Sequence, residues 1–176
     1  CRQQMRMLRQ KITQAEREYA AMDLYVQCNK LEIYQKAPDV VLYAPLIDEL
    51  SPWLLMEEQR KAKRFYLPVC NKNGFIEHFS QYTQKTKLYR NRWGVLEPDS
   101  PPAQGLSTVL IIVPCVALDL QGYRLGYGKG VYDRFLASAP QSTNTLYVAY
   151  ACNKTTTVYP KDHDVQGKYR LWARLK

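Results

Sequence analysis

Residues 107–114 read STVLIIVP, and this run of sequence decides the fold class. It is apolar without alternating polar positions, a pattern typical of a strand that is covered on both faces. A second run of this kind, TLYVAYA at 145–151, follows a helical stretch at 131–139. Two buried strands separated by a helix indicate an α/β fold, with a mainly parallel sheet flanked by helices.

Shorter signals extend this prediction toward the N-terminus. Runs rich in β-branched and aromatic residues predict further strands at 39–45, 65–69 and 75–82. A helix is expected over 52–63, with Ser51 as its N-cap and Pro52 as its first residue. Three prolines make 97–105 a loop. The segments on either side of that loop are each too small for a separate core, so we expect a single domain over 1–176.

The first residues predict one amphipathic helix over 2–22. Its apolar positions are spaced alternately by three and four residues: Met5, Leu8, Ile12, Ala15, Tyr19 and Met22. Arg2, Arg6 and Arg9 lie on a neighbouring face at i, i+4 and i+7. Their guanidinium groups are therefore expected beside whatever surface the apolar stripe packs on.

The charge balance favours an anionic partner. Lysine and arginine number 25 against 16 acidic residues, which gives a net charge of +9. Nucleic acid, anionic lipid and a small polyanion such as a nucleotide all fit that charge. The longest apolar run is too short and too interrupted to span a bilayer. The five cysteines form no CxxC pair, which favours a reducing compartment. The Arg-rich amphipathic start could be a mitochondrial address, but we expect a cytoplasmic protein, and a monomer.

The segment most informative about chemistry is RLGYGKGVYD at 124–133. It follows the buried strand and leads into a helix, the place where open α/β sheets bind their ligands. Its alternating glycines leave backbone amides uncovered, and the helix adds its positive N-terminal end. Arg124 and Lys129 supply cations, and Asp133 offers the hard oxygen ligand that Mg²⁺ prefers. The segment is neither a Walker loop nor a GxGxxG motif, because position 131 is valine, and the glycines alone could form only a tight turn.

Residues 107–136 also resemble a known family. The stretch IIVPCVALDLQGYRLGYGKGVYDRFL is similar to the signature PGxxFDxxGxRLGxGxGYYDxxL of 5-formyltetrahydrofolate cyclo-ligases, also called methenyltetrahydrofolate synthetases. Weaker matches keep the family's order along the chain: RQQMR at 2–6, DELS at 48–51, LP at 67–68, WGVLEP at 93–98 and PKDHD at 160–164. The resemblance implies a fold of the NagB/ribose-5-phosphate isomerase/CoA-transferase type.

The family also implies site residues at matching positions. ATP would contact Arg2, Arg6, Arg124, Leu125, Gly126, Tyr127, Gly128, Lys129, Gly130, Val131 and Tyr132. The folate would contact Ala44, Glu49, Trp93, Tyr127, Gly128, Lys129, Gly130 and Val131. Magnesium would lie between Asp133 and Asp164, while Arg124, Lys129 and Glu49 would carry the chemistry.

The implied reaction is a magnesium- and ATP-dependent ligation in one-carbon metabolism. A formamide oxygen is a poor leaving group, so attack of N10 on the N5-formyl carbon needs that oxygen to be phosphorylated first. Phosphate then departs as 5,10-methenyltetrahydrofolate closes, and the protein positions the reactants and neutralises charge. Both substrates are anionic, and polyglutamylated folates strongly so, which suits the net charge of +9.

Several positions depart from the family pattern. Arg2 replaces a lysine, Cys115 a glycine and Val131 an aromatic residue, and the C-terminus reads KYRLWARLK. We expect these changes to affect folate affinity more than ATP binding. Two alternatives stay open at this point: a relative that binds ATP without cyclo-ligase activity, and a basic nucleic-acid-binding protein.

Each site residue also has a plainer interpretation. Glu49 could be an acid at a helix start, Trp93 a core residue and Asp164 a turn cap. Arg2 and Arg6 could form a solvated helix face. Cys115, beside the buried strand, is expected to be an inert packed thiol.

Overall fold

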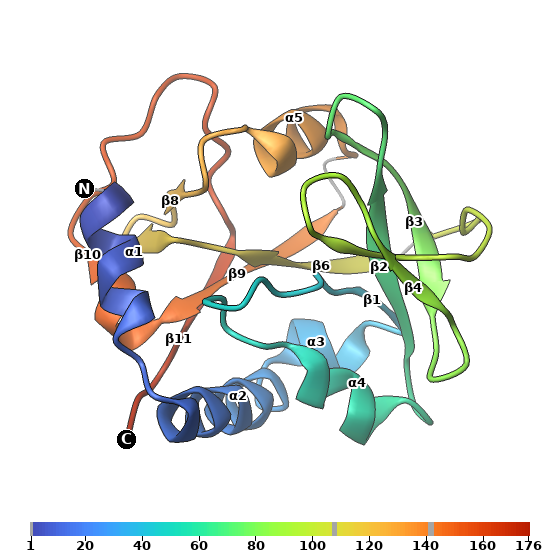
Figure 1. Ribbon diagram of the computed structural model, residues 1–176, viewed down its shortest axis with the longest axis horizontal. Helices are drawn as coiled ribbons and strands as arrows, with labels where there is room; N and C mark the ends of the chain where they lie inside the picture. Colours follow the sequence, from blue (N-terminus) through green and yellow to red (C-terminus); the bar gives the residue numbers. More distant parts are fainter. Residues whose placement is uncertain (1, 107–108, 141–142) are drawn as a thin grey trace.

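The computed structural model describes residues 2–106, 109–140 and 143–176. Its centre is a six-stranded sheet in the order β11-β9-β6-β1-β2-β3, parallel except for the antiparallel β2–β3 pair (Figure 1). These strands are β1 (Asp39–Val41), β2 (Arg64–Cys70), β3 (Ile76–Tyr82), β6 (Val109–Pro114), β9 (Asn144–Tyr150) and β11 (Tyr169–Ala173). The α/β class with a mainly parallel sheet is therefore confirmed.

Alternating side chains of the central strands serve two cores. Val40, Leu110 and Ile112 face one cluster, whereas Val41 and Ile111 face the other, and all five are fully buried. Burial on both faces explains why residues 109–114 show no polar alternation. Residues 107 and 108 of that predicted strand lie outside the described part of the chain.

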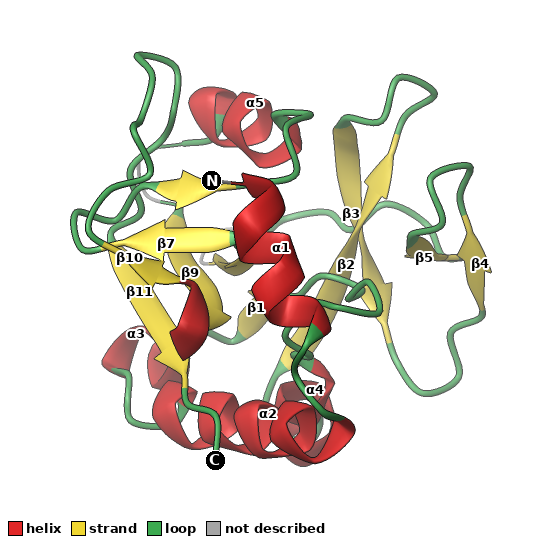
Figure 2. Ribbon diagram, turned by 60° about the vertical axis from the view of Figure 1, so that its left-hand side comes forward, coloured by secondary structure: helices red, strands yellow, loops and turns green. Residues whose placement is uncertain are grey.

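Helices cover the two faces unequally. Helices α2 (Gln14–Cys28), α3 (Glu32–Lys36) and α4 (Trp53–Gln59) lie below the sheet in Figure 1, and α5 (Val131–Ser138) lies above it. Helix α1 (Arg2–Gln10) crosses in front of the sheet, as Figure 2 shows most clearly. Strands β7 (Ala117–Asp119), β8 (Arg124–Leu125) and β10 (Lys154–Thr155) form a small second sheet.

A hairpin stands apart from both sheets on the side of β3 (Figure 2). It is made of β4 (Leu88–Arg90) and β5 (Leu96–Pro98), which pair in antiparallel fashion. The one remaining helical turn, η1 (Ala151–Asn153), follows β9.

The single helix predicted over 2–22 was wrong. The chain breaks after Gln10, and a new helix begins at Gln14 with Thr13 as its N-cap. Thr13 and Glu16 form a capping box, in which each side chain bonds the other residue's backbone amide. The apolar spacing continues through the break, so it hid this start signal.

Other predicted bounds also need correction. Helix α4 covers only residues 53–59 of the predicted 52–63, and Pro52 is its N-cap in place of Ser51. Lys63 lies outside the helix, and its ammonium group donates to the carbonyls of Tyr34, Gln35 and Ala37. Strand β1 ends at residue 41 instead of 45, and β5 lies partly within the predicted loop 97–105.

The structure also confirms the expected environment of Cys115. Its side chain is buried, and burial raises the pKa of the thiol to about 12. A thiol with so high a pKa stays protonated and unreactive at neutral pH. Among the described residues, no helix has both the length and the apolar character needed to cross a membrane.

Candidate active site

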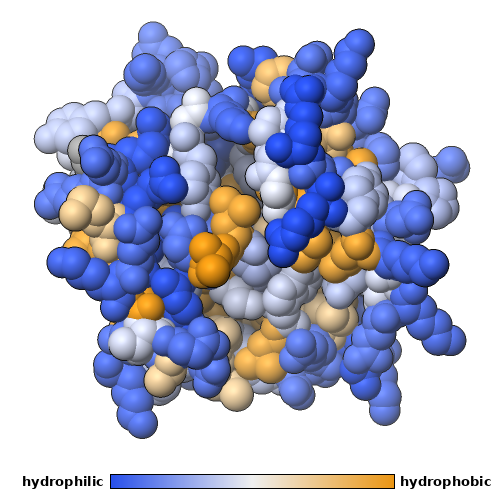
Figure 3. Space-filling view, viewed as in Figure 1, coloured by the Kyte–Doolittle hydropathy of each residue, from blue (hydrophilic) through white to orange (hydrophobic). Residues whose placement is uncertain are grey.

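A cleft of about 460 Å³ opens at the carboxyl ends of β1, β2 and β6. Tyr43, Ala44 and Glu49 reach it from the segment after β1, and Cys70 and Pro114 mark the ends of β2 and β6. Figure 3 shows this face as largely hydrophilic and hollowed in its upper half. Parallel sheets bind their ligands at this edge, because loops from several strands converge there.

The cleft brings together nearly all of the site residues that the sequence suggested. Its lining includes Arg2, Ala44, Glu49, Trp93, Arg124, Leu125, Gly126, Tyr127, Gly128, Lys129, Gly130, Val131, Tyr132, Asp133 and Asp164. Arg6 is the exception. Its guanidinium carbon lies 5.4 Å from the centre of the ring of Tyr127, a residue of the glycine loop.

Helix α1 is fastened to the glycine loop at its first residue. The Arg2 Nε donates a hydrogen bond of 2.7 Å to the carbonyl oxygen of Gly126. The same guanidinium covers Gly128, where an added Cβ would lie 3.1 Å from Nη1. Arg2 therefore places a cation beside the backbone amides of the glycine loop, and an anion-binding site combines these two features.

Arg9 fastens α1 a second time, from a buried position. It is 1% exposed, and its Nη2 donates 2.6 Å to the Tyr127 hydroxyl and lies 3.2 Å from Asp48 Oδ1. Its Nε donates to the Asp48 carbonyl oxygen at 2.8 Å. Tyr127 completes the triangle with a 3.2 Å hydrogen bond to Asp48 Oδ1. Arg9, Asp48 and Tyr127 thus join α1, the segment after β1 and the glycine loop.

Glu49 stands at the floor of the cleft in a tight turn. Its Oε2 accepts a 2.8 Å hydrogen bond from the Leu46 amide, and its own amide donates to the Leu46 carbonyl oxygen. The carboxyl group does not start a helix, since α4 begins at Trp53. Burial raises the pKa of Glu49, opposed by the hydrogen bond from Leu46 and the charge of Arg9. A carboxyl group with a raised pKa in a cleft is a candidate for contact with substrate.

Arg124 and Asp133 form an ion pair under the glycine loop. Arg124 Nη2 lies 2.5 Å from Asp133 Oδ1, and Arg124 Nη1 donates 2.6 Å to the Tyr147 hydroxyl. The Arg124 side chain is only 4% exposed. The Arg124 guanidinium is therefore engaged mainly by Asp133 and Tyr147. Lys129 is the cation of this segment that is more available to a ligand in the cleft.

The carboxylates of Asp133 and Asp164 suit magnesium in number and kind. Asp133 Oδ1 also lies 3.5 Å from the amide of Val165, the residue after Asp164, and both aspartates line the cleft. Asp164 Oδ2 accepts from the Lys161 amide, so the carboxylate also caps a turn. The described residues hold no group of three or more acidic, histidine or cysteine side chains at metal-binding distance. Magnesium normally binds one or two carboxylates and completes its shell with waters and substrate phosphates, so these two residues fit it.

Trp93 forms the opposite wall of the cleft. It sits in the turn of the β4–β5 hairpin, packed on Gly74, where an added Cβ would lie 2.8 Å from the indole ring. Arg92 lies over the ring at 4.4 Å, and Lys129 approaches it at 5.5 Å from the glycine loop. The indole is partly exposed and lines the cleft, so it is not an ordinary core residue.

The sequence-based set lacked several residues that line or support the cleft, among them Arg9, Asp48, Tyr159 and Lys161. Arg9 shares the face of Arg2 and Arg6, and that spacing could have identified it. Asp48 and Lys161 lie within the weaker family matches at 48–51 and 160–164, which assigned them no role, and Tyr159 carries no such signal. Their places at the cleft follow from turns that only the folded chain defines.

Comparison with known proteins agrees with this geometry. A model described as the 5-formyltetrahydrofolate cyclo-ligase family matches residues 1–168. The chain belongs to this family.

Individual members of the cyclo-ligase family match over most of their length. The 5-formyltetrahydrofolate cyclo-ligase of Haemophilus influenzae is 28% identical, covering 92% of this chain and 89% of its own. That of Escherichia coli K12 is 35% identical over 65% of each chain. The NMR structure of Aquifex aeolicus 5,10-methenyltetrahydrofolate synthetase superposes with a TM-score of 0.82 at 27% identity, covering 96% of this chain and 86% of its own. A Mycoplasma pneumoniae synthetase shares the fold, with a TM-score of 0.74 at 19% identity over 96% and 94% of the two chains.

Proposed function

We propose that this chain converts 5-formyltetrahydrofolate and ATP to 5,10-methenyltetrahydrofolate, ADP and phosphate. The observation that carries the proposal is the shared cleft, in which a cationic glycine loop faces a buried carboxyl group and an indole. Lys129 belongs to the loop, Glu49 to the floor and Trp93 to the far wall. Membership of the cyclo-ligase family supports the same assignment.

The glycine loop suits a triphosphate. Its backbone amides lie between the Arg2 guanidinium and the start of α5, whose N-cap is Gly130. Amides, a helix N-terminus and full positive charges together form a phosphate-binding surface. Lys129 is the cation best placed for the terminal phosphate, because Arg124 is engaged by Asp133 and Tyr147.

The opposite part of the cleft suits the folate. The flat pterin would pack on Trp93, and Glu49 would accept hydrogen bonds from its N–H groups or orient the formyl end. Ala44 and Val131 supply apolar lining between the two.

The reaction then needs positioning rather than a protein nucleophile. The formyl oxygen attacks the γ-phosphorus of ATP, the bond to the bridging oxygen breaks, and ADP leaves. N10 next attacks the formyl carbon, the phosphorylated oxygen departs as phosphate, and the proton of N10 is lost to water. Magnesium held by Asp133 and Asp164 would supply further positive charge at the transferring phosphate. Lys129 neutralises the same charge from the protein, and the walls of the cleft hold both reactants in line.

The direct test uses purified protein, Mg-ATP and 5-formyltetrahydrofolate, with the near-ultraviolet absorbance of methenyltetrahydrofolate as the readout. We expect product that depends on ATP, and about a hundredfold lower rate in the Lys129→Ala variant, since one transition-state contact of this kind typically contributes that much. Lys85→Ala, an exposed lysine outside the cleft, is the matched control. Tight ATP binding without product would instead identify a nucleotide-binding relative that lacks the reaction. Salt-dependent RNA binding in place of ATP binding would identify the nucleic-acid alternative.

A further inference from the structure

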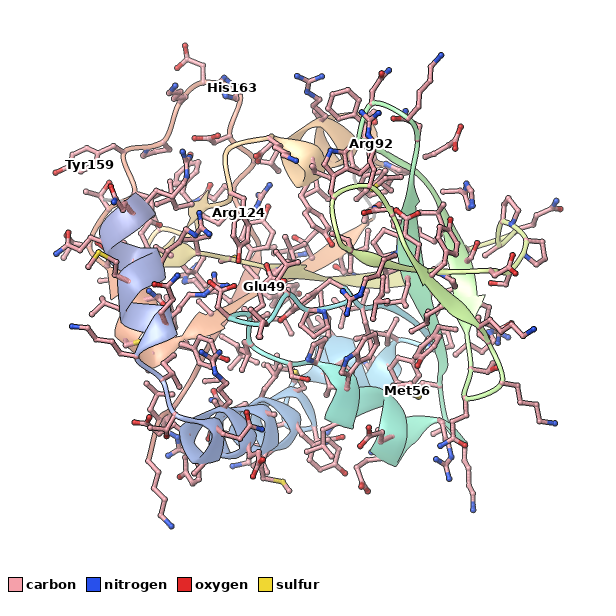
Figure 4. All side chains as sticks on the ribbon, in the orientation of Figure 1. Glu49, Met56, Arg92, Arg124, Tyr159 and His163 are labelled. Carbon is pink, nitrogen blue, oxygen red and sulfur yellow. The ribbon has the colours of Figure 1, made fainter. Side chains whose placement is uncertain are left out.

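Glu49 lies on a segment that has no regular secondary structure. Residues 42–52, between β1 and α4, form neither a helix nor a strand, although several of them are buried. Figure 4 shows Glu49 near the centre of the molecule, below Arg124. Buried carbonyl groups without backbone partners must accept hydrogen bonds from side chains or water. The donors to these carbonyls therefore decide where Glu49 is held.

Three consecutive carbonyl oxygens of this segment, at residues 48, 49 and 50, accept hydrogen bonds from buried side chains. The pairs are Arg9 Nε with Asp48 at 2.8 Å, the Tyr150 hydroxyl with Glu49 at 3.1 Å, and the Tyr43 hydroxyl with Leu50. The three donor residues are at most 3% exposed. They belong to α1, to β9 and to the stretch after β1, so three parts of the fold fix one turn, residues 46–50, which we call the Glu49 turn.

Tyr150 is the donor to Glu49 itself, and it is held from behind. Its hydroxyl accepts a 3.3 Å hydrogen bond from Arg17 Nη1, and Arg17 Nη2 donates to the Arg9 carbonyl oxygen at 2.8 Å. Burial raises the pKa of Tyr150, so the hydroxyl stays protonated and remains a donor at neutral pH. Arg17, on α2, therefore ties together two of the three supports of the Glu49 turn.

The two ends of Glu49 face different surroundings. Its carboxyl group lines the cleft and accepts from the Leu46 amide, a bond within the Glu49 turn that does not tie the turn to the sheet. Its carbonyl oxygen accepts from Tyr150, which lies on β9, a strand with neighbours on both sides in the sheet. The bond from Tyr150 therefore fixes the backbone of Glu49 relative to the sheet, and with it the place from which the carboxyl group enters the cleft.

We propose that Tyr150 is a positioning residue for the reaction, which holds the Glu49 turn so that the carboxyl group meets the folate in the cleft. Tyr43 and Arg9 support the same turn at the neighbouring carbonyls. This inference rests on the proposed function for the role of Glu49. Misplacement of a group that contacts substrate lowers the rate even when the group itself is unchanged. Loss of the Tyr150 hydroxyl should therefore lower activity through Glu49, without contact between Tyr150 and substrate.

The test is the Tyr150→Phe variant, which removes the hydroxyl and keeps the ring in the core. We expect kcat/KM for 5-formyltetrahydrofolate to fall about fivefold, the usual effect of one hydrogen bond, while the KM for ATP stays the same. The matched control is Tyr66→Phe. Tyr66 is 5% exposed, and its hydroxyl donates to Asp39 Oδ1 at 2.9 Å, at the amino end of β1 and away from the cleft. The control should lower stability in urea at least as much as Tyr150→Phe and leave the kinetic constants unchanged.

A double-mutant cycle shows whether Tyr150 acts through Glu49. In the Glu49→Ala background, Tyr150→Phe should cause no further loss of kcat/KM, since no carboxyl group is left to position. Tyr43→Phe, which removes the donor to Leu50, should behave in the same way: it lowers kcat/KM in the native chain and has no effect in the Glu49→Ala background. Additive losses would overturn the proposal, as would an unchanged kcat/KM in Tyr150→Phe or an equal loss in Tyr66→Phe.

An NMR titration of the Glu49 carboxyl group tests the positioning without substrate. In Tyr150→Phe the loosened turn admits water, so the pKa of Glu49 should fall toward its ordinary value of 4.5, whereas in Tyr66→Phe it should stay raised. An unchanged pKa in Tyr150→Phe would overturn the proposal. A native chain that forms no cyclo-ligase product would refute the proposed function, and the titration would still decide whether Tyr150 positions Glu49.

Discussion

The two walls of the cleft are built from different interactions. The wall formed by α1 and the glycine loop is fastened by charged side chains, chiefly Arg9 on Asp48 and Arg2 on the Gly126 carbonyl. The hairpin wall is fastened by backbone turns at 71–74 and 91–94, in which each asparagine Oδ1 accepts from two following amides. The first wall is therefore fastened by arginine side chains, whereas the second is fastened by turns and by the buried carboxylate of Glu97, which accepts from the Cys70 amide and Asn91 Nδ2.

The difference matches the ligands proposed for each side. A triphosphate needs cations that are already in place, and here arginines of one helix both face the loop and hold it. A pterin needs a flat surface in a fixed position, and the Trp93 indole, packed on Gly74, supplies one. Damage to the first wall should therefore alter ATP binding, and damage to the second should alter folate binding.

The largest effect is expected for Arg9→Met, which removes the contacts of Arg9 that fasten the α1 wall. The substitution keeps an unbranched side chain but removes the guanidinium group, so the largely buried Asp48 loses its cation, and Asp48 Oδ2 already lacks a partner among the described residues. Removing one member of a buried ion pair costs about 3 kcal/mol or more of folding free energy. Urea denaturation measures this loss, and the KM for ATP should rise more than the KM for folate. The control is Arg92→Met on the exposed face of the hairpin wall, and a loss no larger than that of the control would contradict the prediction.

The next effect comes from the twin turns of the hairpin wall. Gly74 and Gly94 occupy the same turn position with φ values of 82° and 80°, so alanine is strained at both. An added Cβ at Gly94 meets nothing within 4 Å, whereas at Gly74 it meets Trp93 at 2.8 Å. We expect Gly94→Ala to cost about 1 kcal/mol and Gly74→Ala about 2 to 3 kcal/mol, because overpacking adds to the strain.

Enzyme kinetics should distinguish the Gly74→Ala and Gly94→Ala variants as well. Gly74→Ala displaces the indole, so the KM for folate should rise while the KM for ATP stays the same, and Gly94→Ala should leave both unchanged. Steady-state kinetics with each substrate varied in turn provides the measurement. Equal kinetic effects of the two substitutions would show that Trp93 does not set the shape of this wall.

A smaller effect is expected at the break between α1 and α2. Thr13→Ala removes the side chain that caps α2 at the Glu16 amide, which should cost about 1 kcal/mol. Thermal or urea unfolding measures the loss, with the exposed Thr156→Ala as control. Since α1 keeps its contacts through Arg2 and Arg9, the KM for ATP should change little. A large rise in that KM would mean that the cap, and not the arginines, orients α1.

The smallest effect on stability, with the opposite sign, is expected for Glu49→Gln between the two walls. Burial raises the pKa of Glu49 above its ordinary value of 4.5, so the folded state favours the protonated form. The stabilisation from Glu49 is complete below pH 4.5 and is lost as the pH rises through the folded-state pKa. The variant should therefore be more stable than the native chain at pH 7, and the difference should shrink toward pH 4. Urea denaturation at several pH values checks this, and a difference independent of pH would contradict it.

The same variant should lower kcat/KM for folate by about tenfold or more, because a hydrogen bond to a charged group is replaced by a neutral one. The affinity for ATP should stay the same, since Glu49 lies at the floor of the cleft rather than on the glycine loop. Loss of ATP affinity would place Glu49 on the nucleotide side.

The sequence predicted the centre of the fold better than its edges. Continuous apolar runs identified β6 and β9, because both faces of these strands are covered. Strand β11 was not predicted, although Leu171 and Ala173 are buried, Trp172 between them is partly exposed and Arg170 before them is exposed. That alternation is typical of an edge strand, but charged neighbours and a five-residue length hid it.

The candidate site also has parts that the sequence predicted and parts that it did not. The glycine loop could be read directly, since its residues are adjacent in sequence and its chemistry is local. The Arg9–Asp48 pair joins positions 39 residues apart, and nothing in either neighbourhood indicates the other. Likewise, the pairing of Arg124 with Asp133 depends on how the loop turns between β8 and α5, so neither residue could be predicted from the sequence to form this ion pair.

The order of the strands has a consequence for how the chain reaches its native state. Strand β1 pairs on one side with β2 and on the other with β6, whose residues lie far along the chain. During synthesis the backbone of residues 39–41, which carries the apolar side chains of Val40 and Val41, therefore presents an unpaired edge until residues 109–114 emerge. Such non-local parallel pairing slows folding and exposes an edge to other chains. We expect refolding yield to fall steeply with protein concentration, and early chaperone contact to concentrate on this edge.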